Sequence, residues 1–395
     1  MSLQTLRILE FRPVWLTVDG NGPFPERPYG IDFTDASGAP CNAFLFMSDN
    51  GMGKTTLLQI MANMMRVWGE REPKYWGVEG LDSGELRAQW DLRIRVYWRG
   101  EEKVIILSLL AGNFSDDLAL LKPWGTAELA QAQADSWHGA GYRRRARGFL
   151  TEIGRSDELC ADLTDTFREW NQEEAENSAG GFSGTAFDLP TALYFSAYRD
   201  IPAVASHERA IGRPEHWGYR TAHLFDPHSN RWRDSLDNLL VWLKWLDQNL
   251  LPDQPGRFDR ARDFVNRHVF DETPDKFLEG ISVETLAAIV RNGDARHRLD
   301  RLSSGEKNLV HLFLRIGAHM TRHTLIFIDE PEVHLHPRWQ YRLIRQLKAL
   351  PKNDPGITVI AATHSVDMLK AFAFEIPEDG LHKGGDIIQK SKEEA

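Results

Sequence analysis

Residues 48–56, with the sequence SDNGMGKTT, decide the fold of this 395-residue chain. An apolar run precedes them at residues 43–47, and helical apolar spacing continues through residues 57–61. In the order strand, glycine-rich loop, helix, backbone N–H groups and the helix N-terminus surround an anion. Glycine permits the backbone conformations and close approach that a side chain would block. The pattern therefore predicts a phosphate-binding loop that contacts a nucleotide through Asn50, Gly51, Met52, Gly53, Lys54, Thr55 and Thr56.

Two side chains of this loop have the functional groups needed to bind a nucleoside triphosphate and its metal ion. A lysine in this position reaches the β- and γ-phosphates, and the hydroxyl that follows it holds Mg²⁺, so Lys54 and Thr55 are the candidates. The sequence departs from the pattern G-x-x-x-x-G-K-[ST] at its first position, where Ser48 replaces glycine. The alternative interpretation of the loop alone is a surface turn before a helix.

Composition restricts the class of protein and its compartment. The formal net charge of −10 argues against a surface that coats nucleic acid non-specifically, although a local basic patch remains compatible with it. Cys41 and Cys160 lack a C-x-x-C spacing, which suggests a reducing compartment and excludes a cysteine-rich zinc module. The first residues lack a long apolar run, and no apolar run approaches about 18 residues. We therefore expect a cytoplasmic protein with no signal peptide and no membrane partner.

The chain between the motifs predicts a mixture of strands and helices. Alternation over residues 91–98 and an apolar run at 103–107 predict a β-hairpin. Residues 191–197 predict a buried strand, and the polar residues 198–200 that follow it are placed to reach a site at the sheet edge. Residues 125–172 are mostly polar, and we expect them to be helical.

An arginine-rich run, Tyr142-Arg143-Arg144-Arg145-Ala146-Arg147, lies within that expected helical region. The favoured interpretation of the run is a solvated helix face. The functional alternative is contact with nucleic acid or with an acidic partner, because arginine side chains neutralise phosphate charge.

Three later stretches strengthen the nucleotide interpretation. Residues 302–307, LSSGEK, open an apolar helix with small polar residues that suit a second anion site. Residues 324–331 form an apolar run that ends in two acids; Asp329 suits the Mg²⁺ shell, and Glu330 suits a water-orienting general base. Another apolar run, 357–362, ends at His364, which is placed to contact the γ-phosphate.

The four motifs in this order resemble the ABC-type ATPases, and the run DEPEVHLHP at residues 329–337 resembles the soluble OLD and RecF-like branch. The resemblance covers roughly the first 110 residues and residues 281–369. It implies an α/β P-loop NTPase fold, an ABC-type ATPase head with an N-terminal antiparallel β subdomain in residues 1–111. A largely helical inserted region would follow in 112–280. Residues 281–395 would hold the signature at 302–306, the Walker B motif at 326–331 and the switch histidine, His364.

The same resemblance implies the assembly and the cofactors. Two subunits would sandwich two ATP molecules with Mg²⁺, so that the signature residues Ser303, Ser304 and Gly305 of one subunit face the phosphate loop of the other. The glutamine that couples the lobes in the family is not identifiable, and residues 196–199 are the candidate region for it. Catalysis would rest on Lys54, Glu330 and His364, and the metal on Thr55 and Asp329.

The leading hypothesis for function is an ATP-hydrolysing homodimer, or a higher homo-oligomer, that drives or gates a DNA-directed process, with an anti-phage defence system as the favoured one. Members of this branch serve DNA repair and anti-phage defence. Roughly 30 residues follow His364, too few for an appended nuclease domain, so we expect a separate effector such as a nuclease. The alternatives are an ATP-bound scaffold that sequesters an effector with little turnover, and a DNA repair ATPase of RecF type. A transporter subunit fits poorly, because the loop and the signature are too far apart in sequence.

Overall fold

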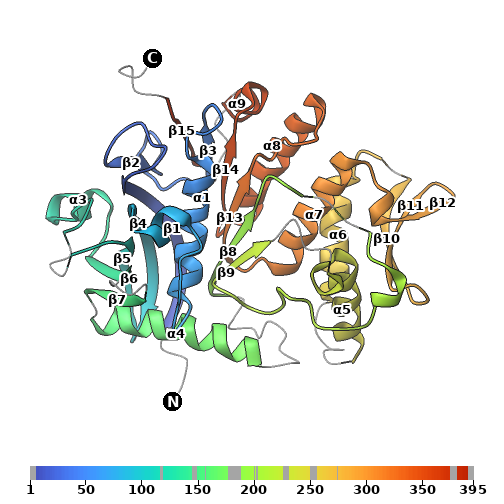
Figure 1. Cartoon of the computed structure of the whole chain (residues 1–395), viewed down its shortest axis with the longest axis horizontal. Helices are drawn as coiled ribbons and strands as arrows, with labels where there is room; N and C mark the ends of the chain where they lie inside the picture. The colour runs from blue at the N-terminus through green and yellow to red at the C-terminus, as the bar shows by residue number, and fades with distance from the viewer. Residues whose placement is uncertain are drawn as a thin grey trace.

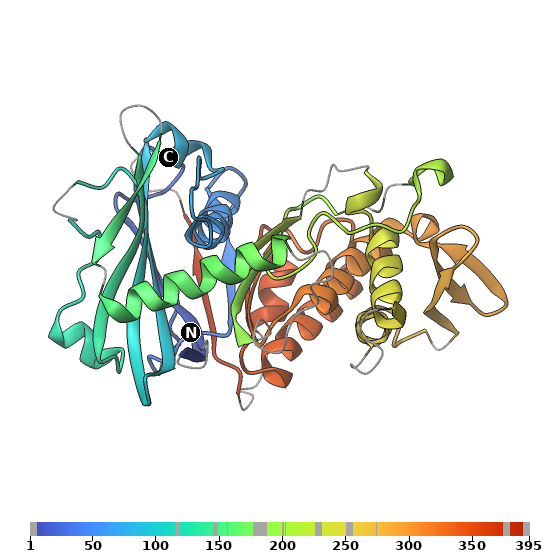
Figure 2. The same ribbon diagram turned by 90° about the horizontal axis from the view of Figure 1, so that it is seen from below.

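The computed structural model describes residues 6–115, 119–144, 149–155, 157–176, 188–199, 201, 203–225, 231–249, 256–273, 275–373 and 380–389. The described strands form two six-stranded sheets and one three-stranded sheet, arranged side by side along the long axis of the molecule (Figure 1). Seen at right angles, the antiparallel sheet lies at one end and the small sheet at the other, and helix α4, Glu158–Glu176, runs from the antiparallel sheet towards the centre of the molecule (Figure 2).

A parallel sheet in the order β15-β3-β14-β13-β8-β9 forms the centre of the fold. Its inner strands are continuous apolar runs, which is typical of strands buried on both faces. Because the strands are parallel, all their carboxyl ends meet at one edge of the sheet. The bounds are β3 Ala43–Met47, β8 Pro190–Phe195, β9 Ala222–Phe225, β13 His323–Asp329, β14 Thr358–Thr363 and β15 Lys383–Ile387.

A second sheet, in the order β2-β1-β4-β5-β6-β7, packs beside the first and is antiparallel except at the β5–β6 pair. The hairpin predicted at residues 91–107 is confirmed, and it turns at Arg99 and Gly100, both of which have positive φ. The N-terminal antiparallel β subdomain is therefore present. The bounds are β1 Leu6–Gly20, β2 Tyr29–Asp32, β4 Leu86–Trp98, β5 Glu101–Gly112, β6 Ser136–Arg144 and β7 Leu150–Arg155.

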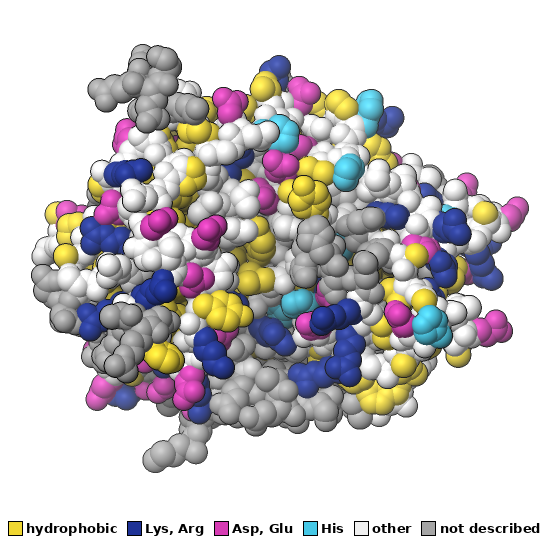
Figure 3. Space-filling view, in the orientation of Figure 1, with side chains coloured by type: hydrophobic (Ala, Val, Ile, Leu, Met, Phe, Trp, Pro, Cys, Tyr) yellow, Lys and Arg dark blue, Asp and Glu magenta, His cyan; other side chains and the backbone are white. Residues whose placement is uncertain are grey.

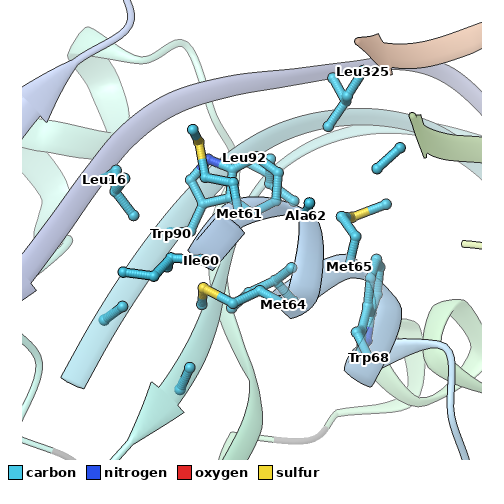
Figure 4. Packing of buried hydrophobic residues seen from close by; sticks show 14 of the residues in the cluster. Leu16, Ile60, Met61, Ala62, Met64, Met65, Trp68, Trp90, Leu92 and Leu325 are labelled. Atoms are coloured by element: carbon cyan, nitrogen blue, oxygen red, sulfur yellow. The ribbon is translucent and has the colours of Figure 1, made fainter. Parts of the chain in front are cut away.

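Helix α1, Lys54–Trp68, fills the space between the two large sheets. Its methionines Met61, Met64 and Met65 are all at most 2 % exposed, and they pack with Trp90 of β4 and Leu325 of β13 in one apolar cluster (Figure 4). Methionine fills irregular gaps of this kind well, because its side chain is unbranched and polarisable. The helix that follows the phosphate loop is thus anchored on both sides, which fixes the direction in which the loop points.

A helical lobe carries the remaining elements, and a second apolar cluster joins it to the parallel sheet. Helices α5 and α6 pack on α7, and the small sheet β10-β11-β12 lies at their far end (Figure 1). The bounds are α5 Leu236–Asn249, α6 Arg257–Val269, α7 Ser304–His319, β10 Lys276–Ser282, β11 Ala287–Asn292 and β12 Ala295–Arg298. Helices α8 Pro337–Asn353 and α9 Val366–Ala373 follow β13 and β14 respectively, and short helices α2 Glu79–Ser83 and α3 Thr126–Gln131 flank the antiparallel sheet.

The expectation that residues 125–172 are helical is correct for α3 and for α4, Glu158–Glu176, but it is wrong for the strands β6 and β7 between them. Tyr142, Arg143 and Arg144 belong to strand β6, so the arginine-rich run does not lie on a helix face there; Arg145 and Arg147 lie outside the described residues. The reason is tertiary pairing, because β6 is hydrogen-bonded on both sides. The close pairing of β6 with β5 requires glycine at position 141, because a Cβ there would stand 2.0 Å from the carbonyl oxygen of Leu110.

The region 112–280 combines helices with strands: β6 to β9 each join one of the two large sheets, and most of β10, in the small sheet, also lies in this region. This region therefore contributes to the ATPase head itself as well as to the helical lobe. The positions of the domain boundaries stay a prediction.

Candidate functional site

The phosphate loop closes around its own lysine. Lys54 is 5 % exposed and donates hydrogen bonds to the carbonyl oxygen of Ser48 at 2.8 Å, to its hydroxyl at 2.9 Å and to the carbonyl oxygen of Asp49 at 2.9 Å. Burial lowers the pKa of Lys54, while the nearby carboxylates of Glu330 and Asp329 oppose this. The serine that replaces the usual glycine thus supplies two of the three oxygens around the ammonium group.

The two loop glycines serve different purposes. Gly51 and Gly53 have φ of +79° and +85°, a left-handed conformation that side chains disfavour. A Cβ at Gly53 would also lie 2.7 Å from the ring of Phe24, whereas a Cβ at Gly51 would meet no atom within 4 Å. The segment before β2 therefore packs directly against the start of α1, and Gly53 is required for space as well as for conformation.

A hydrogen bond of 2.7 Å from the Thr55 hydroxyl to Oδ2 of Asp329 joins the loop to strand β13. Asp329 is 3 % exposed, and its Oδ1 has no hydrogen-bond partner among the described residues. Burial raises the pKa of Asp329, against the lowering effect of its bond with Thr55. A buried carboxylate with an unpaired oxygen beside a hydroxyl is a set of hard oxygen donors, so the residues fit Mg²⁺.

Glu330 and His364 meet at the ends of β13 and β14. The Nδ1 of His364 lies 3.3 Å from Oε1 of Glu330 and 3.5 Å from Oε1 of Glu332. Glu330 has φ of +43°, an uncommon conformation for a residue with a side chain, and such strain gathers at functional sites. Both side chains are partly exposed, at 26 % and 44 %, so a ligand has access to them.

Glu332 was not predicted from the sequence. It is 6 % exposed, and its Oε1 accepts hydrogen bonds from the hydroxyl of Thr363 at 2.5 Å and the backbone N–H of His364 at 3.2 Å. The only signal in the sequence was its position two residues after Glu330. In the structure it holds the switch segment against the end of β13.

Arg199 was also not assigned a role from the sequence, although its segment was the candidate region for lobe coupling. The side chain is 4 % exposed and donates to the carbonyl oxygens of Asp329 and Glu330, each at 2.7 Å, and to that of Ser196. Burial lowers its pKa to about 10. Its Nε donates to the side chain of Asn308 on α7 at 2.7 Å. One guanidinium thus connects β8, the end of β13 and the signature helix.

The signature residues form the start of α7. Ser303 caps the helix and exchanges hydrogen bonds with Glu306, a reciprocal capping box. Burial raises the pKa of Glu306, but bonds from Lys276 and Ser303 outweigh this and lower it. Ser303 and Ser304 are exposed, and a Cβ at Gly305 would stand 3.2 Å from the carbonyl oxygen of His334. The helix start therefore packs on the segment after β13 and presents its serines outward.

The structure brings Lys54, Thr55, Asp329, Glu330 and His364 together because β3, β14, β13 and β8 are neighbours in the sheet. This fold and this arrangement of motifs define an ABC-type ATPase of the kind found among AAA and DNA-repair proteins. A family model described as "AAA domain, putative AbiEii toxin, Type IV TA system" matches residues 158–369, more than half of the chain, and the chain belongs to this family.

Curated relatives match over shorter stretches. UvrABC system protein A from Thermus thermophilus is 36 % identical over 113 residues, which are 27 % of this chain and 11 % of that protein. UvrABC system protein A from Clostridium perfringens is 36 % identical over 90 residues, 22 % of this chain and 9 % of that protein. The chain spans about a tenth of the length of these relatives.

Among solved structures, the SMC head domain from Thermotoga maritima is 14 % identical with a TM-score of 0.37, and 92 % of each chain is covered. A SmcHead bound to the C-winged helix domain of ScpA is 10 % identical with a TM-score of 0.41 and 91 % coverage of each chain. Within the described residues, no helix combines the length and the apolar character needed to cross a membrane.

Proposed function

We propose that this chain binds ATP with Mg²⁺, hydrolyses it, and uses the cycle to drive or gate a DNA-directed process. The observation that carries this proposal is the 2.7 Å hydrogen bond between Thr55 and Asp329, next to an unpaired oxygen of the same buried carboxylate. This pair lies at the sheet edge that also holds Lys54, Glu330 and His364.

Each residue has a role that follows from its position. Lys54 exchanges its contacts within the loop for the β- and γ-phosphates, and the loop N–H groups bind the remaining oxygens. Thr55 and Asp329 hold Mg²⁺, which neutralises phosphate charge when bound. Glu330 orients the attacking water and accepts its proton, while His364 contacts the γ-phosphate. Arg199 and Glu332 keep the backbone of these two segments in place.

Dimerisation completes the site in this proposal. Ser303 and Ser304 lie exposed at the N-terminus of a 16-residue helix, where backbone N–H groups and the helix dipole favour an anion. A second copy of the chain would present these residues, together with Gly305, to the γ-phosphate across the interface. ATP then acts as the bridge between two subunits, and its hydrolysis releases them.

The biological output is a defence or toxin–antitoxin function in the cytoplasm with a separate effector, for which a nuclease is the leading class. The family description, which names a putative toxin of a type IV toxin–antitoxin system, supports a system with more than one protein. A repair ATPase is the second candidate, and the similarity to UvrABC system protein A favours it. Acidic and basic side chains are interspersed over the face in Figure 3, so DNA contact would use a local patch.

The test measures ATP hydrolysis and sedimentation of the purified chain and of Glu330→Gln. We expect the variant to bind ATP, to lose turnover, and to double its mass at saturating ATP with Mg²⁺. Glu284→Gln, at an exposed turn, is the matched control and keeps the behaviour of the unmodified chain. Normal turnover in Glu330→Gln would overturn the role of this acid, and a monomer at saturating ATP would overturn the sandwich.

A second measurement tests whether a separate effector exists: the native mass of the chain, purified from cells in which the neighbouring genes are intact. A mixed complex supports a separate effector, whereas a plain homodimer contradicts it and favours direct action on DNA.

A further inference from the structure

A pocket of about 650 Å³ lies outside the ATPase site, between α8, α9 and the turn that follows α6. Its size falls in the range of small-molecule sites, about 300–1,000 Å³. The residues that line it are mainly long and polar: Glu272, Arg338, Tyr341, Arg342, Arg345 and Lys370. None of them has a role in the ATPase site.

The charge of this pocket is positive. Three arginines share one carboxylate, because Arg345, Arg338 and Arg342 approach Glu272 at 3.4 Å, 3.7 Å and 3.9 Å. Lys370 is exposed and has no ion pair within the described part of the chain. Four cations thus line the pocket against a single lining acid in a chain whose overall charge is −10. An anionic ligand would relieve this local excess.

Arg342 is a buried arginine that lines the pocket and is held in place by its own contacts. It is 7 % exposed, donates to the carbonyl oxygen of Val269 at 3.0 Å and forms an ion pair with Asp271. Its buried Nε has no hydrogen-bond partner among the described residues, and the nearest oxygen of Glu272 lies 3.9 Å away. Buried donors are normally satisfied, so an acceptor that enters the pocket would pair a donor that the described residues leave unpaired.

Tyr341 adds an aromatic surface. It is 48 % exposed, which is high for a large aromatic side chain, and it lies on α8 between two exposed arginines. Positions 338, 341 and 345 follow the spacing i, i+3, i+7 and share one face of the helix. This face therefore offers guanidinium groups that can bind phosphate and an aromatic ring that can stack on the base of the same nucleotide.

The pocket is connected to the catalytic segments through Gln340, the neighbour of Tyr341. Its side chain donates to the carbonyl oxygen of Leu335 at 3.0 Å and accepts from the hydroxyl of Ser365 at 3.1 Å. Leu335 follows the end of β13, and Ser365 is adjacent to His364. Helix α9 begins directly after Ser365. Movement of α8 relative to α9 would therefore shift the switch histidine.

We propose that this pocket binds a nucleotide unit of single-stranded nucleic acid, with the base on Tyr341 and the phosphates on Arg338, Arg342 and Arg345, and that binding adjusts the ATPase site through Gln340. This rests on the DNA-directed function proposed above and names where the strand would be held. An acidic peptide would use the arginines but gain little from an exposed ring, whereas stacking on a base uses both.

The test measures binding of a fluorescent oligothymidylate by anisotropy, without ATP, over a range of salt concentrations. We expect Tyr341→Ala to weaken binding roughly tenfold, because base stacking on an aromatic ring contributes about 1–3 kcal/mol. Arg338→Ala with Arg345→Ala should reduce the salt slope by about 1.4, since each phosphate contact on a single strand adds about 0.7. Arg291→Ala with Arg296→Ala, an exposed pair on the small sheet, is the charge-matched control and keeps full binding.

Two competitors identify the ligand. If thymidine monophosphate competes as well as the oligonucleotide, the pocket binds free nucleotides; if it competes poorly, the strand is the ligand. Equal binding by the chain and all pocket variants, absence of binding, or equal competition by polyglutamate overturns the proposal. Lys54→Ala separates the two proposals. If this variant binds the oligonucleotide but does not hydrolyse ATP, the pocket is supported independently of the ATPase site. If the pocket variants hydrolyse ATP normally but do not bind the oligonucleotide, the loss of binding arises in the pocket.

Discussion

The guanidinium of Arg199 donates a 2.7 Å hydrogen bond to the side-chain oxygen of Asn308 and so joins the end of β8 to the signature helix. The same guanidinium binds the backbone of Asp329 and Glu330. Asn308 in turn donates to the carbonyl oxygen of Val333 at 2.6 Å. The two acids at the end of β13 are therefore held from both sides, by the sheet and by the helix that faces a second subunit in the proposed dimer.

Arg199→Lys should lower turnover roughly tenfold to hundredfold, because lysine keeps the charge but loses the planar fork that holds two carbonyl oxygens. We expect kcat to fall more than the apparent KM rises, since Arg199 touches the backbone of Glu330 and not the phosphate loop. Steady-state kinetics measures this split. Arg315→Lys is the matched control, a buried arginine paired with Asp234 away from the site, and it should lose stability but keep turnover. Equal effects on turnover from both variants would contradict a positioning role for Arg199.

Lys54→Ala should abolish ATP binding, because its ammonium is the loop's only side-chain cation and the phosphates require charge compensation. Binding of a fluorescent ATP analogue measures the loss. Lys244→Ala, an exposed lysine on α5, should bind normally. Unchanged affinity in Lys54→Ala would contradict the phosphate-loop assignment.

Asp329→Asn should abolish hydrolysis and leave the free protein as stable as before, or more stable by about 1 kcal/mol. Burial raises the pKa of this carboxylate, so its charged form destabilises the folded state when no cation is bound. Urea unfolding without Mg²⁺ measures stability, and phosphate release measures hydrolysis. A loss of stability larger than about 2 kcal/mol would show that the carboxylate is structural, since that is the range for breaking buried polar contacts.

Gly53→Ala should weaken ATP binding more than Gly51→Ala. Both residues have positive φ, which disfavours alanine by about 1–2 kcal/mol. Only at Gly53 would the added carbon meet a neighbour, at 2.7 Å from the Phe24 ring. Calorimetric titration with ATP compares the two variants, and Gly53→Ala with Phe24→Leu should recover part of the loss. Equal losses in the two single variants would exclude the contact with Phe24 as the cause.

Acidification should destabilise the protein through His323. Burial lowers the pKa of this histidine to about 4, and its Nε2 donates to the carbonyl oxygen of Ile8 at 3.1 Å, so the folded state keeps it neutral. Because the unfolded state takes up the proton near pH 6.5, this contribution is complete above that pH and is lost as pH falls towards 4. Between pH 7 and pH 5 the loss is about 2 kcal/mol.

Urea unfolding at the two pH values measures this effect, and His323→Gln, which keeps an amide donor, should show a smaller decrease. The same decrease in both proteins would place the pH dependence at other groups.

The local parts of the site could be predicted from the sequence. A strand, a glycine-rich loop and a helix are adjacent in the chain, so the pattern at residues 43–61 predicts their geometry without reference to anything distant. The same holds for the capping serine of α7 and for the acids that end β13. Their order along the chain was enough to predict the class of ATPase.

The chemistry of each motif followed from its own residue types, but the contacts between motifs were decided only by the tertiary structure. The order β3-β14-β13-β8 places the ends of four strands from distant parts of the chain side by side, and this order is not encoded in any single strand. Arg199 and Glu332 acquire their roles from that neighbourhood, as does the pairing that makes β6 a strand. The basic pocket likewise arises where α8, α9 and the turn after α6 meet. Local sequence determines the conformation of the phosphate loop and of the helix caps. Hydrogen bonds between buried residues more than 100 positions apart depend on which strands become neighbours.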